Sequence, residues 1–297
     1  MSGTAVTVLT PTYNRKATLP RLYNSLLEQS SFDFQWLIVD DGSSDGTEEY
    51  IRGLQSEKFR IDYYWKSNGG KHTALNFSHP YITGEIVVIV DSDDYLLPDA
   101  IQTIASEWTM FRNCNDICGM SYFRGFADGT HLSLEAKEDF YIDDDISYRV
   151  NNPRIKGDRC EVVRTDLFRA YPFPEYAGEK FISEDILWNR LAYRYKTVYR
   201  NKVLYICEYL EGGLSASGRK LRLQSGNGMA TATKTYLSSR VRLARRVKAT
   251  WLFICYSKCA GKKMRYIVVQ SGQPILTLFN YPFGWILYQY WKNKYLE

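Results

Sequence analysis

The carboxyl-terminal part of this 297-residue sequence lacks acidic side chains. From Gly212 to Leu296 there are 15 Lys and Arg residues and no Asp or Glu, whereas the rest of the chain has 23 basic and 33 acidic residues. An acidic body joined to a basic tail is typical of a protein whose tail meets anionic partners. Those partners could be phospholipid, pyrophosphate or nucleic acid.

Motifs that define several other protein classes are missing. No predicted strand is followed by a Gly-x-Gly-x-x-Gly fingerprint, which argues against an NAD enzyme, and there is no Walker-type Gly-Lys-Ser/Thr loop. The six cysteines form no Cys-x-x-Cys pair and no ligand pattern with His, so we interpret them as reduced structural residues, consistent with a cytosol. The four-residue spacings of Cys114/Cys118 and Cys255/Cys259 place each pair on one face of a helix.

Long apolar runs are absent as well. The most apolar window, 275–288, is shorter than a spanning helix requires and contains Asn280, Pro282 and Gly284. The start, Met-Ser-Gly-Thr, has no basic n-region, so we expect no signal peptide. Aromatic residues make up 15% of the sequence, and the 24 Tyr suit sugar platforms, membrane interfaces or ordinary cores.

Apolar runs alternate with helix-periodic stretches, which predicts an α/β fold with a mainly parallel sheet flanked by helices. The predicted strands are 5–10, 34–39, 61–65, 85–90, 120–126, 160–164 and 198–204. The predicted helices are 19–29, 45–54 (with Asp45 as its cap), one beginning near 74, 98–111 and 183–195. Residues 212–228 are rich in Gly and Ser and predict a mobile loop.

From about residue 231 the sequence predicts a basic helical extension, which divides the chain into a domain at 1–225 and a region at 226–297. One side of the first predicted helix there is apolar and consists of Leu243, Val247, Trp251 and Ile254. The opposite side carries Arg242, Arg245 and Arg246. Such a basic amphipathic helix suits an anionic membrane surface, although packing on the rest of the protein is the alternative.

Polar clusters follow three predicted strands, where sheets of this kind bind ligands. They are Thr10–Arg15, Asp40–Ser44 and Asp91–Asp94. The three carboxylates of Asp91-Ser92-Asp93-Asp94 repel one another unless a cation lies among them. Their oxygens suit Mg²⁺ or Mn²⁺ with phosphate completing the shell, although a solvated acidic turn would look the same.

Two further clusters begin helices. In the loop Asn68–Asn76, backbone N–H groups and Lys71 could hold a diphosphate, or the glycines could serve only a turn. In Ser183-Glu184-Asp185 the acids either favour the helix N-terminus or supply a general base for an acceptor hydroxyl.

Together these clusters have the order and spacing of a known family. The chain resembles family 2 of the nucleotide-sugar glycosyltransferases, which have the Rossmann-like GT-A fold. The matching stretches are 6–15, 37–47, 68–76, 90–94 and 183–185, and the resemblance covers about residues 5–217. Lys156-Gly-Asp-Arg159 and residues 208–215 are similar to bacterial capsule or exopolysaccharide members.

The resemblance implies roles for individual residues. The nucleoside pocket would be lined by Thr10, Pro11, Tyr13 and Arg15. Asp41, with Asp40 nearby, would bind the base, which is uracil in most relatives, and Lys71 would face the base or the diphosphate. Ribose and metal would be held by Asp91 and Asp93, with Ser92 between them and Asp94 adjacent. Asp185 would be the catalytic base, with Glu184 as the fallback.

The same resemblance implies an inverting, in-line displacement in which Asp185 takes the acceptor proton while a divalent metal, Mn²⁺ or Mg²⁺, stabilises the departing diphosphate. The Gln-x-x-Arg-Trp motif of processive synthases is absent, so one sugar per acceptor is expected. Arg219, Lys220 and Arg222 would either close over the diphosphate or form a solvated basic loop.

We therefore expect a UDP-sugar donor, a saccharide acceptor linked to polyprenyl diphosphate and attachment to the inner face of the cell membrane, with no nucleic acid. Two alternatives stay open. A sugar nucleotidyltransferase would need a Gly-rich loop after the first strand, which Thr10–Arg15 lacks. A non-catalytic protein could bind nucleic acid or membranes through the basic region.

Overall fold

The structure is a computed structural model that describes residues 4–131, 133–152, 154–155, 157–207 and 214–296. The chain forms two compact units that interleave along the sequence. The first consists of Met1–Asp144, Pro153–Pro172 and Arg194–Glu208, and the second of Asp145–Asn152, Phe173–Tyr193 and Tyr209–Glu297. The second unit therefore contains segments from well before residue 226, and a functional division at 225/226 stays a prediction.

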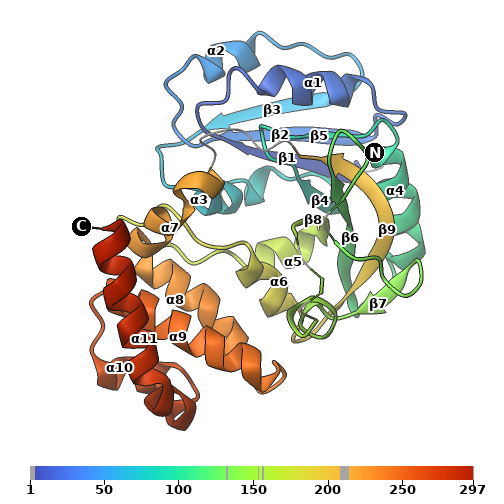
Figure 1. The fold of residues 1–297 in the computed structure, drawn as a ribbon. Coiled ribbons are helices and arrows are strands. Elements are labelled where there is room, and N and C mark those ends of the chain that lie inside the picture. Colours follow the sequence, from blue (N-terminus) through green and yellow to red (C-terminus); the bar gives the residue numbers. More distant parts are fainter. Residues whose placement is uncertain (1–3, 132, 153, 156, 208–213, 297) are drawn as a thin grey trace. The chain divides into compact units, whose positions relative to one another are not determined.

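The first unit contains all nine strands of the described residues (Figure 1). Its strands are β1 (Val6–Thr12), β2 (Phe34–Asp40), β3 (Arg60–Trp65), β4 (Ile86–Ile89), β5 (Tyr95–Leu96), β6 (Ile117–Gly125), β7 (Tyr141–Asp143), β8 (Arg159–Arg164) and β9 (Lys196–Ile206). Its helices are α1 (Leu19–Leu27), α2 (Thr47–Arg52), α3 (Lys71–Phe77), the 3₁₀ turn η1 (His79–Tyr81), α4 (Ala100–Phe111) and α5 (Thr165–Ala170).

The strands form one mixed sheet in the order β3-β2-β1-β4-β8-β6-β9-β5, with β7 paired to β9. The four strands β3, β2, β1 and β4 are parallel, as expected from their βαβ connections. β8 then pairs antiparallel with both β4 and β6, so the sheet is mixed beyond the first half. This arrangement confirms an α/β fold and brings the carboxyl ends of β1, β2 and β4 to one edge.

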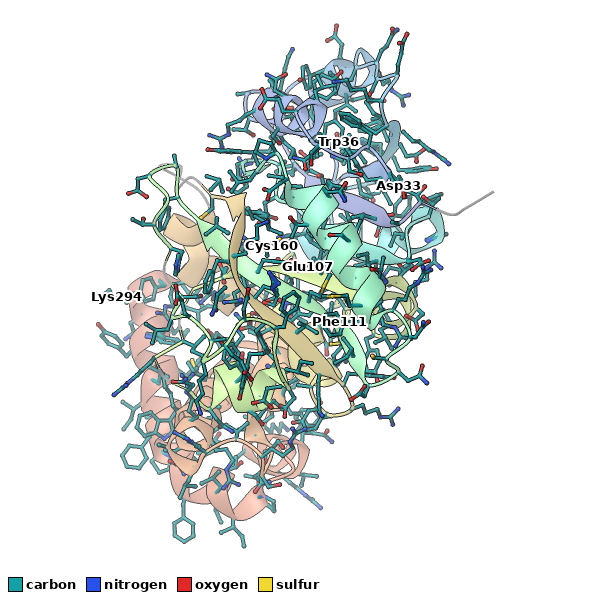
Figure 2. The ribbon with its side chains drawn as sticks, turned by 90° about the vertical axis from the view of Figure 1, so that its right-hand side faces the viewer. Asp33, Trp36, Glu107, Phe111, Cys160 and Lys294 are labelled. Atoms are coloured by element: carbon teal, nitrogen blue, oxygen red, sulfur yellow. The ribbon has the colours of Figure 1, made fainter. Side chains whose placement is uncertain are left out.

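Apolar faces of the first helices cover this sheet. Leu19, Leu22 and Leu26 of α1 share a core with Val8 and Trp36, and all five side chains are fully buried. Figure 2 shows Trp36 inside this layer. Burying each such leucine contributes about 1.5–3 kcal/mol relative to an exposed one, which holds α1 against the strands that carry the polar clusters.

The second unit is helical. It consists of the short π-helix η2 (Ile146–Val150), α6 (Asp185–Leu191), α7 (Leu214–Gln224), α8 (Gly226–Lys234), the 3₁₀ turn η3 (Thr235–Leu237), α9 (Leu243–Cys259), α10 (Met264–Gln270) and α11 (Pro274–Tyr295). Leu223, Met229, Phe253 and Ile254 form part of its buried core. None of the helices in the described ranges is long and apolar enough to span a membrane.

The loop predicted for 212–228 is wrong where the structure describes it, because α7 and α8 occupy most of that segment. Two of its glycines, Gly226 and Gly228, serve close packing. A Cβ on Gly226 would lie 2.7 Å from the backbone N of Ala260, and one on Gly228 would lie 2.9 Å from the carbonyl oxygen of Phe181. Composition alone does not distinguish glycines that loosen a chain from glycines that let a helix approach its neighbours.

Three smaller expectations also change. Only the later part of the predicted apolar side of α9 is covered by protein: Ile254 is fully buried, and Trp251 stacks on Phe283 and donates a 2.7 Å hydrogen bond to Asn280, whereas Leu243 is 60% exposed. Cys118 lies in β6, so it does not share a helical face with Cys114, whereas Cys255 and Cys259 do lie together on α9. The helix expected from Asp45 begins at Thr47, although the Asp45 carboxylate does accept a bond from the Thr47 amide.

Candidate functional site

A pocket of about 100 Å³ lies at the carboxyl ends of β1, β2 and β4 in the first unit. It is lined by Pro11, Thr12, Tyr13, Arg15, Asp41, Lys71, Asp91, Ser92 and Asp93. Parallel pairing of β1 with both neighbours explains this convergence, since all three strands end at the same edge. The half-exposed Tyr13 ring offers an apolar face beside charged groups.

The carboxylate of Asp41 organises the glycine loop after β3. It accepts hydrogen bonds from the amides of Gly69 (2.9 Å) and Gly70 (2.6 Å) and from Lys66 Nζ (2.7 Å). Asn68 also donates to it. The loop therefore holds a fixed shape beside the pocket, and Lys66 is a residue that the sequence motifs missed.

The turn that carries Asp41 requires a glycine. Gly42 has φ of +85°, and a Cβ there would lie 2.8 Å from the Asn68 amide nitrogen. A side chain at this position would push the two loops apart. The Asp-Asp-Gly sequence is thus explained by close approach as well as by backbone conformation.

Asp91 lies between two cations. Its carboxylate is 2.5 Å from Lys71 Nζ and 3.5 Å from Arg124 Nη1. Burial alone would raise the pKa of Asp91, but Lys71 and Arg124 outweigh it and hold that pKa at about 2. Arg124, on β6, was not singled out from the sequence because 33 residues separate it from Asp91.

Asp93 lies on the other side of the pocket. Its carboxylate is 3.3 Å from Arg15 Nη2, and its carbonyl oxygen accepts a bond from Arg21 of α1. Arg15 and Lys71 thus present positive charge toward the pocket, and each pairs with one of its three carboxylates, Arg15 with Asp93 and Lys71 with Asp91. An anionic ligand that enters the pocket could replace Asp93 and Asp91 as the partners of these two cations.

Asp94, the third acid of the cluster, does not line the pocket. It is buried and accepts a 2.6 Å hydrogen bond from the Tyr205 hydroxyl, which in turn accepts a bond from the Asp91 amide. Burial and, next, the charge of Asp91 raise the pKa of Asp94 to about 6. Asp94 therefore fixes the strand end and is not exposed to a ligand.

The donor set fits a divalent cation that is shared with a phosphate ligand. The parts of the chain that the structure describes contain no cluster of three or more His, Cys, Asp or Glu side chains arranged around a common metal position. Asp91 and Asp93, however, are hard oxygen donors that line one pocket and are only about a quarter exposed. Mg²⁺ and Mn²⁺ sites of this kind use one or two carboxylates and take further oxygens from phosphate.

Two expected lining residues lie behind the pocket. Thr10 is fully buried, and its hydroxyl accepts a bond from the Trp36 indole. Asp40 is also buried and accepts bonds from the Ser43 amide and the Tyr63 hydroxyl. Both side chains bond within the strand ends and do not line the pocket.

The candidate base belongs to the second unit. Asp185 is exposed at the start of α6 and accepts hydrogen bonds from the Tyr236 hydroxyl (2.9 Å) and the Ser183 hydroxyl (3.1 Å). Burial, followed by the charge of Asp185, raises the pKa of Tyr236 well above its usual range, so this phenol stays a donor. Glu184 precedes Asp185 at the cap position and is less exposed.

The structure describes two of the three basic residues at 219–222 in contacts with aromatic rings, and it describes the two capsule-like stretches only in part. Arg219 lies over the Trp291 ring at 4.1 Å and Arg222 over Phe181 at 5.7 Å, so both guanidinium groups pack on aromatic residues of the helical unit. Arg159 is buried and bonds to Ser121. Lys156 and residues 208–213 of the second capsule-like stretch lie outside the described residues.

Residues 7–169, more than half of the chain, match the family model of glycosyl transferase family 2. The chain therefore belongs to this family. Family membership favours a glycosyltransferase over the nucleotidyltransferase and the non-catalytic binder.

Named relatives agree with this assignment. The chain is 28% identical over 269 residues to TuaG of Bacillus subtilis, a glycosyltransferase assigned to teichuronic acid biosynthesis, covering 87% of this chain and 96% of TuaG. It is 26% identical to the GalNAc(5)-diNAcBac-PP-undecaprenol β-1,3-glucosyltransferase of Campylobacter jejuni, covering 68% and 63% of the two chains. The chain spans between 36% and 63% of the length of three curated relatives.

A solved structure shares the fold. Staphylococcus aureus TarS 1–349 in complex with UDP-GlcNAc superposes with a TM-score of 0.59 at 19% identity, covering 93% of this chain and 89% of that one. This likeness confirms the GT-A fold expected from the sequence.

Proposed function

We propose that the chain transfers one sugar from a UDP-sugar to a hydroxyl group of a lipid-linked saccharide, with inversion at the anomeric carbon. The observation that supports this most is the pocket that joins Asp41, Lys71, Asp91 and Asp93 at one sheet edge. Tyr13 and Arg15 at its rim suit a base and a diphosphate. The choice of a uridine donor rests on the family resemblance, since most relatives bind uracil.

Different residues of the pocket would bind different parts of the donor. Arg15 and Lys71 carry the positive charge that meets a diphosphate, and Asp41 with its loop borders the nucleoside end. A divalent cation, Mg²⁺ or Mn²⁺, held by Asp91 and Asp93 would stabilise the charge that develops on the leaving diphosphate. Lys71 exchanges its bond to Asp91 for the donor phosphate when the donor binds.

Asp185 acts as the general base. Its carboxylate, oriented by Tyr236, removes the proton from the acceptor hydroxyl as that oxygen attacks the anomeric carbon. The bond to the nucleoside diphosphate breaks on the opposite side, which accounts for inversion. Glu184 is the alternative base.

The acceptor is a saccharide on polyprenyl diphosphate at the inner face of a bacterial membrane. The Campylobacter relative is named for a substrate of this kind, and TuaG is assigned to a surface polymer. The basic residues between 219 and 294 support attachment to that membrane. The missing processive motif supports the addition of a single sugar.

The test is a transfer assay with purified protein, UDP-sugars and a synthetic polyprenyl-diphosphate saccharide. Mass spectrometry should show one added sugar and matching UDP release, both lost in Asp93→Asn. Transfer from a different nucleotide sugar alone would contradict the uridine assignment, and polymer formation would contradict single addition.

A further inference from the structure

The helix α11 exposes a row of large apolar side chains along its length. Its exposed members are Ile275, Leu278, Phe279, Phe283, Ile286 and Tyr290, which we call the α11 stripe. Their spacing of three and four residues places them on one side of the helix. Ile275 and Phe279 are 73% and 76% exposed, values far above those of ordinary apolar residues in a folded protein.

The opposite side of α11 packs against the rest of the helical unit, which leaves the stripe exposed. Thr277 and Gly284 are buried there, and a Cβ on Gly284 would lie 2.6 Å from Ile254 of α9. Trp251 of α9 also donates to Asn280 of α11. Because these contacts hold one side of α11 against α9, the stripe faces outward, and only Phe283 at its edge also stacks on Trp251 of α9.

Cations stand beside the stripe and its neighbour α10. Lys294 Nζ lies 3.5 Å from the Tyr290 hydroxyl, and Lys262 Nζ lies 5.5 Å from the centre of the Tyr266 ring. Figure 2 shows Lys294 at the outside of the molecule. Residues 212–296 contain 15 basic and no acidic side chains.

We propose that the α11 stripe lies in the plane of an anionic lipid surface, with its apolar side chains at the acyl-chain boundary and the flanking lysines at the phosphates. Aromatic and aliphatic residues with lysines at their edge suit this boundary. The proposal names the surface through which the proposed membrane attachment occurs, and it rests on the proposed function. It replaces α9, where Leu243 alone of the predicted apolar side is strongly exposed, as the membrane-binding face.

Charge favours lipid over a second copy of the chain. A contact between two copies through α11 would bring together two segments that each carry 15 basic and no acidic residues between positions 212 and 296. Anionic headgroups have the complementary charge. A helix that lies flat also agrees with the absence of a membrane-spanning helix among the described residues.

The test uses vesicles of phosphatidylglycerol and phosphatidylcholine and the full chain. The variant Phe279→Gln/Ile286→Gln should bind these vesicles at least about tenfold more weakly, because two large apolar side chains no longer enter the lipid. The matched control Met110→Gln/Leu134→Gln, at exposed apolar positions of the first unit, should bind as the parent does. The variant Lys292→Gln/Lys294→Gln should bind more weakly at low salt only.

Two results would overturn the proposal. One is unchanged vesicle binding by Phe279→Gln/Ile286→Gln. The other is a parent dimer in sedimentation that this variant converts to a monomer without loss of vesicle binding, which would assign the stripe to a second copy. UDP binding in each variant reports separately on the donor site, so failure of the lipid proposal and failure of the proposed function give different results.

Discussion

The Tyr236 hydroxyl donates a 2.9 Å hydrogen bond to the carboxylate of Asp185, joining residues 51 positions apart. Tyr236 belongs to the turn η3 and packs against the helical core, so it approaches α6 from a fixed position. The exposed acid is thereby held in one orientation. This pairing links the carboxyl-terminal helices to the chemistry that we propose for Asp185.

Replacing Asp185 by Asn removes the proposed proton acceptor while keeping its size. Transfer should fall at least about 100-fold, the usual contribution of a general base, while UDP affinity stays unchanged. Steady-state kinetics and calorimetry would measure the two effects. Glu184→Gln is the matched control, and a larger loss in that variant would move the base to Glu184.

Tyr236→Phe removes the hydroxyl that positions Asp185. We expect kcat to fall about ten- to 150-fold, because a hydrogen bond to a charged group contributes about 1.5–3 kcal/mol, with KM for the donor unchanged. Tyr193→Phe is a close control, because its hydroxyl donates to the Thr235 carbonyl and not to the acid. Equal kcat losses in both variants would show that Tyr236 has only a structural role.

Asp41→Asn should loosen the loop that carries Gly69 and Gly70. An amide can accept through only one oxygen, so at least one loop donor loses its partner, at a cost of about 1–3 kcal/mol in the free energy of unfolding. UDP affinity should fall about tenfold with it. Chemical denaturation and calorimetry test this, with Asp33→Asn, in the turn before β2, as the control. Unchanged UDP affinity would contradict the placement of the nucleoside beside this loop.

The buried Asp94 predicts a pH dependence of stability. Its folded pKa of about 6 lies above the usual 3.8, so the folded state binds the proton more tightly than the unfolded state. The free energy of unfolding should therefore fall as pH rises from about 4 to about 6 and then level off. The low pKa of Asp91 has the opposite sign but acts below 3.8, outside this window.

Asp94→Asn tests that dependence, since its amide oxygen can still accept the Tyr205 bond. In the presence of a chelator the variant should be more stable than the parent by about 1–3 kcal/mol near neutral pH and should lose the slope between pH 4 and 6. Urea titrations across this range give both values. A parent slope that persists in the variant would assign the dependence to another group.

The strand ends were predictable from the sequence, and their partners were not. Asp41, Asp91 and Asp93 each follow an apolar run, and parallel pairing then places them together by geometry alone. Lys66 and Arg124 reach these acids from other strands, and nothing in the local sequence marks them. Long-range contacts of this kind depend on sheet order, which the run of predicted strands leaves open.

In the helical unit, the sequence likewise did not show which side of each helix is exposed. The periodicity of residues 243–254 correctly predicted a helix, but it did not predict which side of that helix is buried, because Leu243 is exposed while Ala249 and Phe253 are buried. Ile254 and Gly284 settle the question by packing α9 on α11. The exposed apolar surface is consequently on α11, where the sequence had suggested only aromatic residues with flanking lysines.

The central claim is that the pocket of Asp41, Lys71, Asp91 and Asp93 binds a nucleoside diphosphate together with a divalent metal. Titration calorimetry of the full chain with UDP, in Mn²⁺ and then in a chelator, tests it most directly. We predict saturable binding in Mn²⁺ that weakens at least about tenfold in the chelator and in Asp93→Asn. Absence of UDP binding in Mn²⁺, or equal affinity in all three conditions, would contradict the proposed donor site.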